Sequence, residues 1–333
     1  MKVLFNCNLP FSLIHGGAPV QIEQTIAGLK QVGVEVEHLQ WWNNGQTTDI
    51  LHHVGYMEPG LTARAHDKGW KVANTVLFTE TVNRSAAALR WRGLGVRLIR
   101  KGPWPRRLKD LFPWRTYHGA DRMIVGLEAE RDLLRNVYGV PAGRIEVVPL
   151  GLAEIFLQAG PPLRTEDHLI CTGRITPSKN SLQLARLARD SRVPVLFVGK
   201  SEDSSSDYWK QFQALVDNRY VKHHEHVGSA AGIVDLLRRA RGYVLMSQYE
   251  NWSLAAHEAA ACGLPLLLPD QPWSRERFAD QASYFPTYEG PRAAAALRTF
   301  YDACPALPPP RVQLIGWPET GRMLRDVYAK MLR

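Results

Sequence analysis

The chain has 333 residues, 45% of them hydrophobic and 22% charged, which indicates a globular protein with room for two domains and excludes a disordered or fibrous one. Its formal net charge is +9, from 41 Lys and Arg against 32 Asp and Glu. Ten basic residues and one acid lie between Arg84 and Arg115, so the rest of the chain balances at 31 against 31. This pattern disfavours a surface coated in positive charge for nucleic acid and leaves one basic segment to explain.

The four cysteines lie far apart without a CxxC pair, which disfavours a disulfide scaffold or a zinc finger and fits a reducing compartment. Residues 1–5 read as a short strand, too short for the apolar stretch of a signal peptide. No apolar run approaches the ~18 residues that span a bilayer. We therefore expect a cytoplasmic protein that is soluble or peripheral on the cytoplasmic face of a membrane.

In chain order, short β-rich runs alternate with amphipathic stretches, as in parallel sheets covered by helices. In the first half of the chain, this pattern predicts strands at 2–6, 34–39, 49–53, 71–78, 120–125 and 145–149, and helices at 20–32 and 128–138. After a linker at 160–162, the second half predicts strands at 168–172, 193–198, 242–246 and 264–268, and helices at 181–189, 231–239, 254–261 and 318–332. Because such folds bind ligands at the carboxyl ends of their strands, we expect the site between the halves.

Two carboxylates bracket the start of one predicted helix. Glu250 lies in the loop after the strand at 242–246, and Glu258 lies about one turn inside the helix that begins near Ser253. N–H groups at a helix start bind anions and carboxylates accept hydrogen bonds from hydroxyls, so a ligand that combines phosphate with sugar would satisfy both. Taken alone, the spacing is better explained by a solvated acidic pair.

A basic pair, Arg174 and Lys179, follows the strand at 168–172. Such a pair can clamp a diphosphate and stabilise charge on a departing phosphate, although a surface loop with two cations is the better interpretation of the pair alone. Gly16-Gly17 before the first helix is a weak third phosphate signal, because turns need glycine in any case.

In this order and at these intervals, the features together resemble the retaining glycosyltransferases with the GT-B fold, the GT4 group, over nearly the whole chain. The motifs that carry the resemblance are Gly16-Gly17, residues 120–125 and 147–151, Gly173-Arg174 with Lys179, residues 197–199, the Glu-x7-Glu pair of Glu250 and Glu258, residues 261–265 and the last helix. The implied fold is α/β, with two Rossmann-like domains facing each other across a deep cleft. The implied domains are 1–160 for the acceptor, 161–315 for the donor, and a helix, 316–333, that crosses back to the first domain.

The resemblance also implies residue roles. Glu258 would accept hydrogen bonds from the ribose, Glu250 would orient the transferred sugar, and Arg174 and Lys179 would hold the diphosphate in place of a metal ion. The implied donor site is Gly17, Gly173, Arg174, Lys179, Asn251, Trp252, Ser253, Leu254 and Glu258, with Arg174, Lys179 and Glu250 catalytic and no metal or cofactor. The implied partners are a UDP- or GDP-sugar and a glycan or lipid-linked glycan acceptor.

Some positions depart from the family pattern. Residues 251–253, Asn-Trp-Ser, replace the usual Gly-Phe-Gly and are expected to reshape the pocket for the donor sugar. The His that many members carry after the fourth strand is absent, and Glu80 or a hydroxyl is the candidate substitute. Lys200 fits a phosphate contact and a surface position equally well. For His52 and His53, acceptor contact and packing are equally supported.

The basic segment interleaves aromatic residues, and its candidate contact residues are Arg90, Trp91, Arg92, Arg97, Arg100, Lys101, Trp104, Arg106 and Arg107. Clustered cations attract anionic headgroups and Trp suits the membrane interface, so membrane or anionic-acceptor contact is favoured over single-stranded nucleic acid, with a solvated loop as the alternative. Because glycines and prolines interrupt the segment, we expect no single long amphipathic helix. Trp41-Trp42 could stack on a sugar or pack in the core, and core packing is favoured. Residues 223–226 are a weak candidate for a metal site.

The sequence therefore predicts a retaining, metal-independent hexosyltransferase of cell-surface polysaccharide or glycolipid synthesis. A non-catalytic nucleotide-sugar or glycan-binding protein on the same fold is the alternative, motivated by the changed residues 251–253 and the missing His. An α/β oxidoreductase is disfavoured because Gly16-Gly17 lacks the Gly-x-Gly-x-x-Gly spacing.

Overall fold

A computed structural model describes residues 1–8, 17–76, 78, 81, 83–105, 114–201, 203–225 and 227–333. Its contacts divide the chain into two compact units, Met1–Gly151 with Ile315–Arg333, and Leu152–Leu314. The linker expected at 160–162 falls inside the second unit, because the N–H of Leu163 donates to the carbonyl of Arg238, 2.7 Å away.

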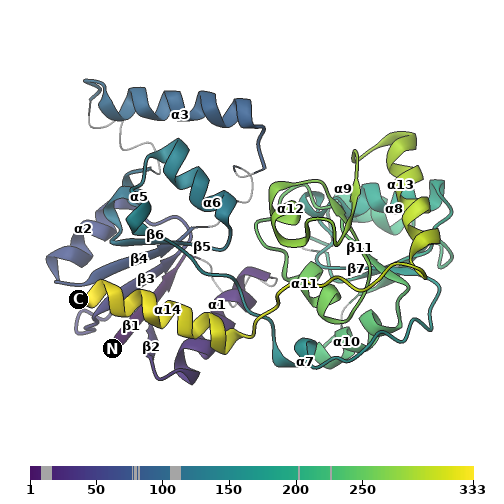
Figure 1. Ribbon diagram of the computed structural model, residues 1–333, viewed down its shortest axis with the longest axis horizontal. Coiled ribbons are helices and arrows are strands. Elements are labelled where there is room, and N and C mark those ends of the chain that lie inside the picture. Colours follow the sequence, from purple (N-terminus) through teal and green to yellow (C-terminus); the bar gives the residue numbers. More distant parts are fainter. Residues whose placement is uncertain are drawn as a thin grey trace. The chain divides into compact units, whose positions relative to one another are not determined.

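The first unit contains a six-stranded parallel sheet in the order β2-β1-β3-β4-β5-β6 (Figure 1). Its strands are β1 (Lys2–Cys7), β2 (Glu35–His38), β3 (Ile50–Val54), β4 (Lys71–Thr75), β5 (Arg122–Val125) and β6 (Ile145–Val147). Its helical segments are α1 (Gly17–Gln31), α2 (Pro59–Asp67), α3 (Ala86–Lys101), α5 (Trp114–Gly119), α6 (Glu128–Leu133), η1 (Leu134–Tyr138), η2 (Ala142–Arg144) and α14 (Trp317–Leu332).

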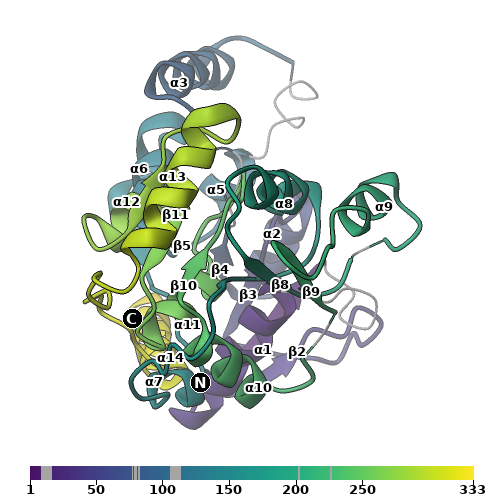
Figure 2. The same cartoon turned by 90° about the vertical axis from the view of Figure 1, so that its right-hand side faces the viewer.

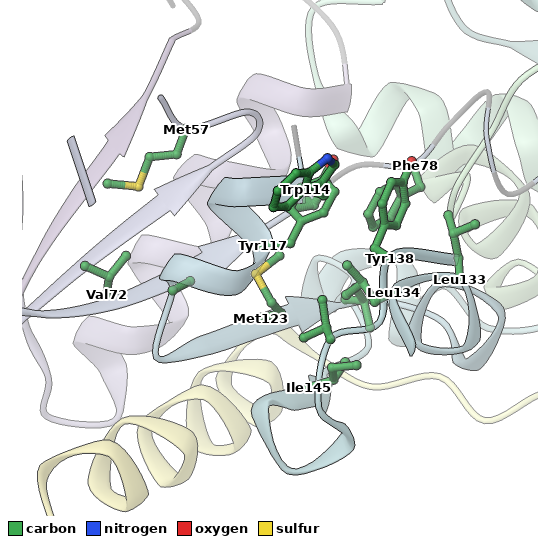
Figure 3. Packing of buried hydrophobic residues seen from close by; sticks show 14 of the residues in the cluster. Met57, Val72, Phe78, Trp114, Tyr117, Met123, Leu133, Leu134, Tyr138 and Ile145 are labelled. Carbon is green, nitrogen blue, oxygen red and sulfur yellow. The ribbon is translucent and has the colours of Figure 1, made fainter. Parts of the chain in front are cut away.

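Both faces of the first sheet are buried, because successive strand residues point to opposite sides. Leu4 and Met123 belong to a core completed by α2, α5 and η1, part of which Figure 3 shows. Val3 and Ile124, their neighbours in sequence, belong to a second core completed by α1 and α14.

Helix α14 packs against α1 at backbone distance, as Figure 1 shows for the yellow helix. A Cβ atom on Gly28 would clash with the carbonyl of Trp317, and one on Gly321 would lie 2.5 Å from the carbonyl oxygen of Gly28. Glycine at both positions permits this crossing. The last residues of the chain thereby complete the core of the first unit.

The second unit contains another six-stranded parallel sheet, in the order β12-β11-β10-β7-β8-β9. Its strands are β7 (Leu169–Thr172), β8 (Val195–Val198), β9 (Val221–His224), β10 (Gly242–Val244), β11 (Leu266–Pro269) and β12 (Ser283–Phe285). Its helical segments are α7 (Glu154–Leu157), η3 (Pro177–Lys179), α8 (Ser181–Asp190), α9 (Asp207–Gln213), α10 (Ala230–Arg239), α11 (Leu254–Ala261), α12 (Pro272–Phe278) and α13 (Gly290–Ala303). Figure 2 shows α8 and α9 side by side next to β8 and β9.

The predicted α/β fold with two parallel sheets is confirmed, and every strand and helix predicted from the sequence is present. The expectation for the basic segment is wrong, because α3 is one continuous helix over Ala86–Lys101. Gly93 does not break it: this glycine faces η1, where the carbonyl oxygen of Asn136 would lie 3.4 Å from a Cβ. Within the described residues, no helix is both long and apolar enough to cross a bilayer.

Candidate functional site

The predicted donor-site residues of the second unit follow β7 and β10, whose carboxyl ends lie next to each other in the sheet. Thr176 caps η3 by accepting a hydrogen bond from the N–H of Lys179. The N–H of Gln248 donates to the carbonyl of Ser178 at 2.9 Å, which ties the loop after β10 to η3. Two loops far apart in sequence thus form one surface at the edge where parallel sheets bind ligands.

An ion pair joins these two loops. The Lys179 ammonium donates to Oε1 of Glu250, and the hydroxyl of Ser247 donates to the same oxygen at 3.0 Å. Glu250 is 7% exposed, so its charge is compensated by contacts of the folded chain. Lysine has two further N–H donors, which leaves it able to bind an anion beside the carboxylate.

Gln271, in the loop after β11, holds the backbone of the loop that carries Glu250. Its amide nitrogen lies 3.0 Å from the carbonyl of Ser247 and 2.7 Å from that of Gln248, while its carbonyl accepts from Trp273 at 2.7 Å. Sequence reasoning missed both Ser247 and Gln271. Their position just after strands of the sheet was the available signal, but no local motif marks Gln271.

The backbone after β7 approaches its neighbour closely. Gly199, which follows β8, has φ +150°, and a Cβ there would clash with the carbonyl of Gly173. Gly173 has φ +140°, is exposed and faces open space, and the half-buried Arg174 follows it. Lys200 lies exposed on the surface after Gly199.

Residue 253 begins α11 in a left-handed conformation. Ser253 has φ 58° and ψ 81°, and its hydroxyl accepts a hydrogen bond from the N–H of Ala256 at 3.4 Å. The first N–H groups of a helix have no partner within the helix, so those of Ser253 and Leu254 suit an anion. A serine here combines a helix cap with backbone strain that glycine would not have.

Trp252 and His257 brace this turn. Their rings stack at 4.7 Å with an interplanar angle of 6°, and the guanidinium of Arg277 lies 4.4 Å from the Trp252 ring. The Nδ1–H of His257 donates to the carbonyl of Ser253 at 2.9 Å, and Nε2 accepts from Nε of Arg277 at 3.2 Å. Burial lowers the pKa of His257 to about 3, so the ring is neutral, as these two bonds require. Trp252 is buried in this cluster.

Glu258 differs from Glu250 in its surroundings. Among the described residues, no group donates a hydrogen bond to its half-buried carboxylate. Burial raises the pKa of Glu258 to about 7, because the charged form has lost water without gaining a compensating donor. Such a group is ready to accept hydrogen bonds from ligand hydroxyls.

The candidate acceptor residues lie in the first unit. His52 is buried, with Nδ1 2.5 Å from the hydroxyl of Tyr328 and Nε2 2.7 Å from that of Thr75, and burial lowers its pKa to about 3. His53 is buried as well, between Asn6 and the carbonyl of Tyr56. These contacts favour the packing interpretation for both histidines. Glu80 lies outside the described residues.

The remaining predicted residues are distributed over both units. Gly17 begins α1 and is exposed, and Asn251 is half-buried after Glu250. The Nε2–H of His223 donates to the carbonyl of Gly199 at 2.9 Å, and the ring packs against Trp209. In the part of the chain that the structure describes, no three His, Cys, Asp or Glu side chains gather to hold a metal ion.

The basic segment has two faces in α3. Arg100 is committed to the fold, because its Nη1 donates to the carbonyls of Tyr138 and Gly139 at 3.2 and 3.3 Å. The opposite face exposes an apolar stripe of Trp91, Leu94 and Leu98. The exposed cations Arg90, Arg97 and Lys101 lie along one side of this stripe, and Arg97 also donates to the carbonyl of Asn136 at 3.5 Å. Arg92 and Trp104 are also exposed, whereas Arg106 and Arg107 lie outside the described residues.

Comparison with known proteins connects this geometry to a family. A family model described as "Glycosyl transferases group 1" matches residues 156–301, which include the Lys179–Glu250 pair and α11. The D-inositol 3-phosphate glycosyltransferase of Kineococcus radiotolerans is 28% identical over 253 residues, 64% of this chain and 58% of that protein. By these two matches, the chain is similar to the group 1 glycosyltransferases.

Other proteins show a similar likeness. A glycogen synthase of Mycobacterium tuberculosis is 29% identical over 157 residues, 44% of this chain and 37% of that protein. The chain thus spans less than two thirds of the length of these relatives. Among solved structures, sucrose-phosphate synthase from Thermosynechococcus elongatus has a TM-score of 0.69 at 14% identity, with 99% of this chain and 98% of that chain covered. That likeness shows the GT-B fold.

Proposed function

We propose that the protein is a retaining, metal-independent glycosyltransferase that moves a hexose from a UDP- or GDP-sugar to a hydroxyl of a glycan or lipid-linked glycan. One observation carries the proposal: a cation and a carboxylate, Lys179 and Glu250, lie side by side at the carboxyl edge of the second sheet. In a nucleotide-sugar the diphosphate is bonded directly to the sugar. Adjacent charges of opposite sign match that junction, since phosphates need cations and hydroxyls need acceptors.

Each residue would have a defined role. The diphosphate would be bound by Lys179, Arg174 and the N–H groups of Ser253 and Leu254. Glu258 would accept a hydrogen bond from each of the two ribose hydroxyls. In the reaction, the bond between C1 of the sugar and the phosphate oxygen breaks, and a bond from C1 to the acceptor oxygen forms on the same face. The acceptor proton passes to the departing phosphate, whose new negative charge is stabilised by the two cations.

The test measures release of UDP or GDP from a panel of nucleotide-sugars in the presence of EDTA. We expect release by the wild-type protein, a loss of at least a hundredfold in Lys179→Met, and unchanged release in Lys210→Met, whose side chain is exposed on α9. NMR of the product would show the anomeric configuration of the donor. Tight binding of a nucleotide without release from any donor would support the non-catalytic alternative. A requirement for added metal would contradict the role given to Lys179.

The outer face of α3 supports a peripheral membrane location on the cytoplasmic side, which suits synthesis of surface polysaccharide or glycolipid. Apolar side chains bordered by cations bind the headgroup region of anionic bilayers. We expect flotation with vesicles that contain phosphatidylglycerol, and its loss when Arg90, Arg97 and Lys101 are changed to Glu. Arg189→Glu on α8 is the matched control, since that side chain is also exposed. Equal flotation of both variants would contradict the proposal.

A further inference from the structure

The loop after β2 holds two tryptophans in water. Trp41 is 67% and Trp42 is 83% exposed, so the expectation that they pack in the core is wrong. Burying an indole ring is strongly favourable, and two neighbouring rings left exposed therefore need an explanation.

A buried network fixes the orientation of Trp41. Its Nε1–H donates to Oδ1 of Asn6 at 3.0 Å, and Nδ2 of Asn6 donates to Nδ1 of His53 at 2.9 Å. The other nitrogen of His53 then donates to the carbonyl of Tyr56 at 3.0 Å. Burial lowers the pKa of His53, so the ring stays neutral and each group in this series has one fixed role. Folding thus positions an exposed ring, and a ligand that stacks on it has little side-chain entropy to overcome.

The loop around these rings carries amide and hydroxyl side chains and no charge over residues 40–48. Gln46 closes it: Oε1 accepts from the N–H of Gln40 at 2.7 Å, and Nε2 donates to the carbonyl of His38 at 3.1 Å. Asn43 reinforces the closure with a bond to the Gln40 side chain at 2.9 Å. Because the N–H of Leu39 bonds to Phe5 near the end of β1, the loop lies at the carboxyl edge of the first sheet, where ligands of such folds bind.

We propose that residues 40–46, with Trp41 and Trp42 as its aromatic platform, form a binding surface for neutral carbohydrate. A pyranose presents an apolar C–H face, which stacks on an aromatic ring, and hydroxyls, which exchange hydrogen bonds with amides. The absence of charge from the loop sequence separates it from α3, whose cations suit anions. The two features also lie at opposite edges of the sheet, because the loop follows β2 and α3 packs on η1, between β5 and β6. The identification of this carbohydrate as the acceptor rests on the proposed function; its binding does not.

The test uses the full chain and saturation-transfer NMR with maltotriose, cellotriose, mannotriose and chitotriose, followed by titration of any that bind. We expect saturable binding of at least one trisaccharide and at least fivefold weaker binding in Trp41→Ala and Trp42→Ala. Trp42→Phe should recover part of the affinity, because it restores a ring. Trp91→Ala, which removes a side chain 75% exposed on α3, should bind as the wild type does.

Binding of UDP and of phosphatidylglycerol vesicles is measured on the same samples. The proposal is overturned if none of the four trisaccharides binds, if the Trp41 and Trp42 variants bind them as well as the wild type, or if these variants lose only vesicle binding. If the wild-type protein does not bind UDP, that result contradicts the proposed function and leaves the trisaccharide result standing.

Discussion

Glu258→Gln is the change that best tests the proposed donor site, because it removes the one carboxyl group whose ionisation we expect to change with nucleotide binding. The free carboxyl has a pKa of about 7, and a ribose that donates two hydrogen bonds to it stabilises the charged form and lowers that pKa. The nucleotide must therefore bind the ionised form, and binding at acid pH must also remove a proton. It follows that affinity rises with pH and levels off above the pKa.

The size of the effect follows from the fraction of Glu258 that is ionised. With a pKa of about 7, about one tenth of the free protein is ionised at pH 6 and about nine tenths at pH 8. The apparent dissociation constant of UDP should thus fall about tenfold between these values, which corresponds to about 1.4 kcal/mol. The terminal phosphate of UDP also titrates near pH 6 and adds a smaller change of the same sign.

Isothermal titration calorimetry with UDP at pH 6, 7 and 8, in two buffers of different ionisation enthalpy, measures both affinity and proton release. At pH 6 we expect the wild-type protein to release close to one proton more than Glu258→Gln, which should keep only the pH dependence that comes from the phosphate. If the wild-type and Gln proteins show the same pH dependence, Glu258 does not contact the nucleotide and the donor site is wrongly assigned.

Substitutions at Glu258, Ser253 and Gly28 test the packing, with Gly95 as a control for Gly28. Without nucleotide, the folded state holds the Glu258 proton more tightly than the unfolded state, because burial raises the pKa of this carboxyl, so stability falls as pH rises from 4.5 to about 7. Urea unfolding at pH 8 should therefore show that Glu258→Gln stabilises the free protein by about 1–3 kcal/mol. Ser253→Ala should cost about 1 kcal/mol through loss of the cap, whereas Ser253→Gly should be close to neutral because it also relieves the left-handed backbone; equal losses would disprove the strain. Gly28→Ala should lower the melting temperature by several degrees, while Gly95→Ala, with open space around a Cβ on α3, should leave it unchanged or raise it.

Much of the fold could be predicted because it depends on local pattern. The buried strands β3 and β11 are short apolar runs, and Gly263 ends α11 with a left-handed conformation of φ +73°, as its position after an alanine-rich helix predicts. α3 was missed because Gly93 and Gly95 are weak helix formers, a local property. In the folded chain Gly93 is instead the point of contact with η1, and packing outweighs propensity.

The candidate site could also be predicted from the sequence only in part. The order of the motifs predicted Arg174, Lys179, Glu250 and Glu258 as a set, since chemistry of this kind depends on residue type and spacing along the chain. Only the tertiary structure decided that Glu250 is paired with a lysine 71 residues away, and that Glu258 has no hydrogen-bond donor among the described residues. It also decided that His52 is buried while Trp41 and Trp42 are exposed. The physical reason is that desolvation and charge pairing are set by neighbours in space, which no local stretch of sequence contains.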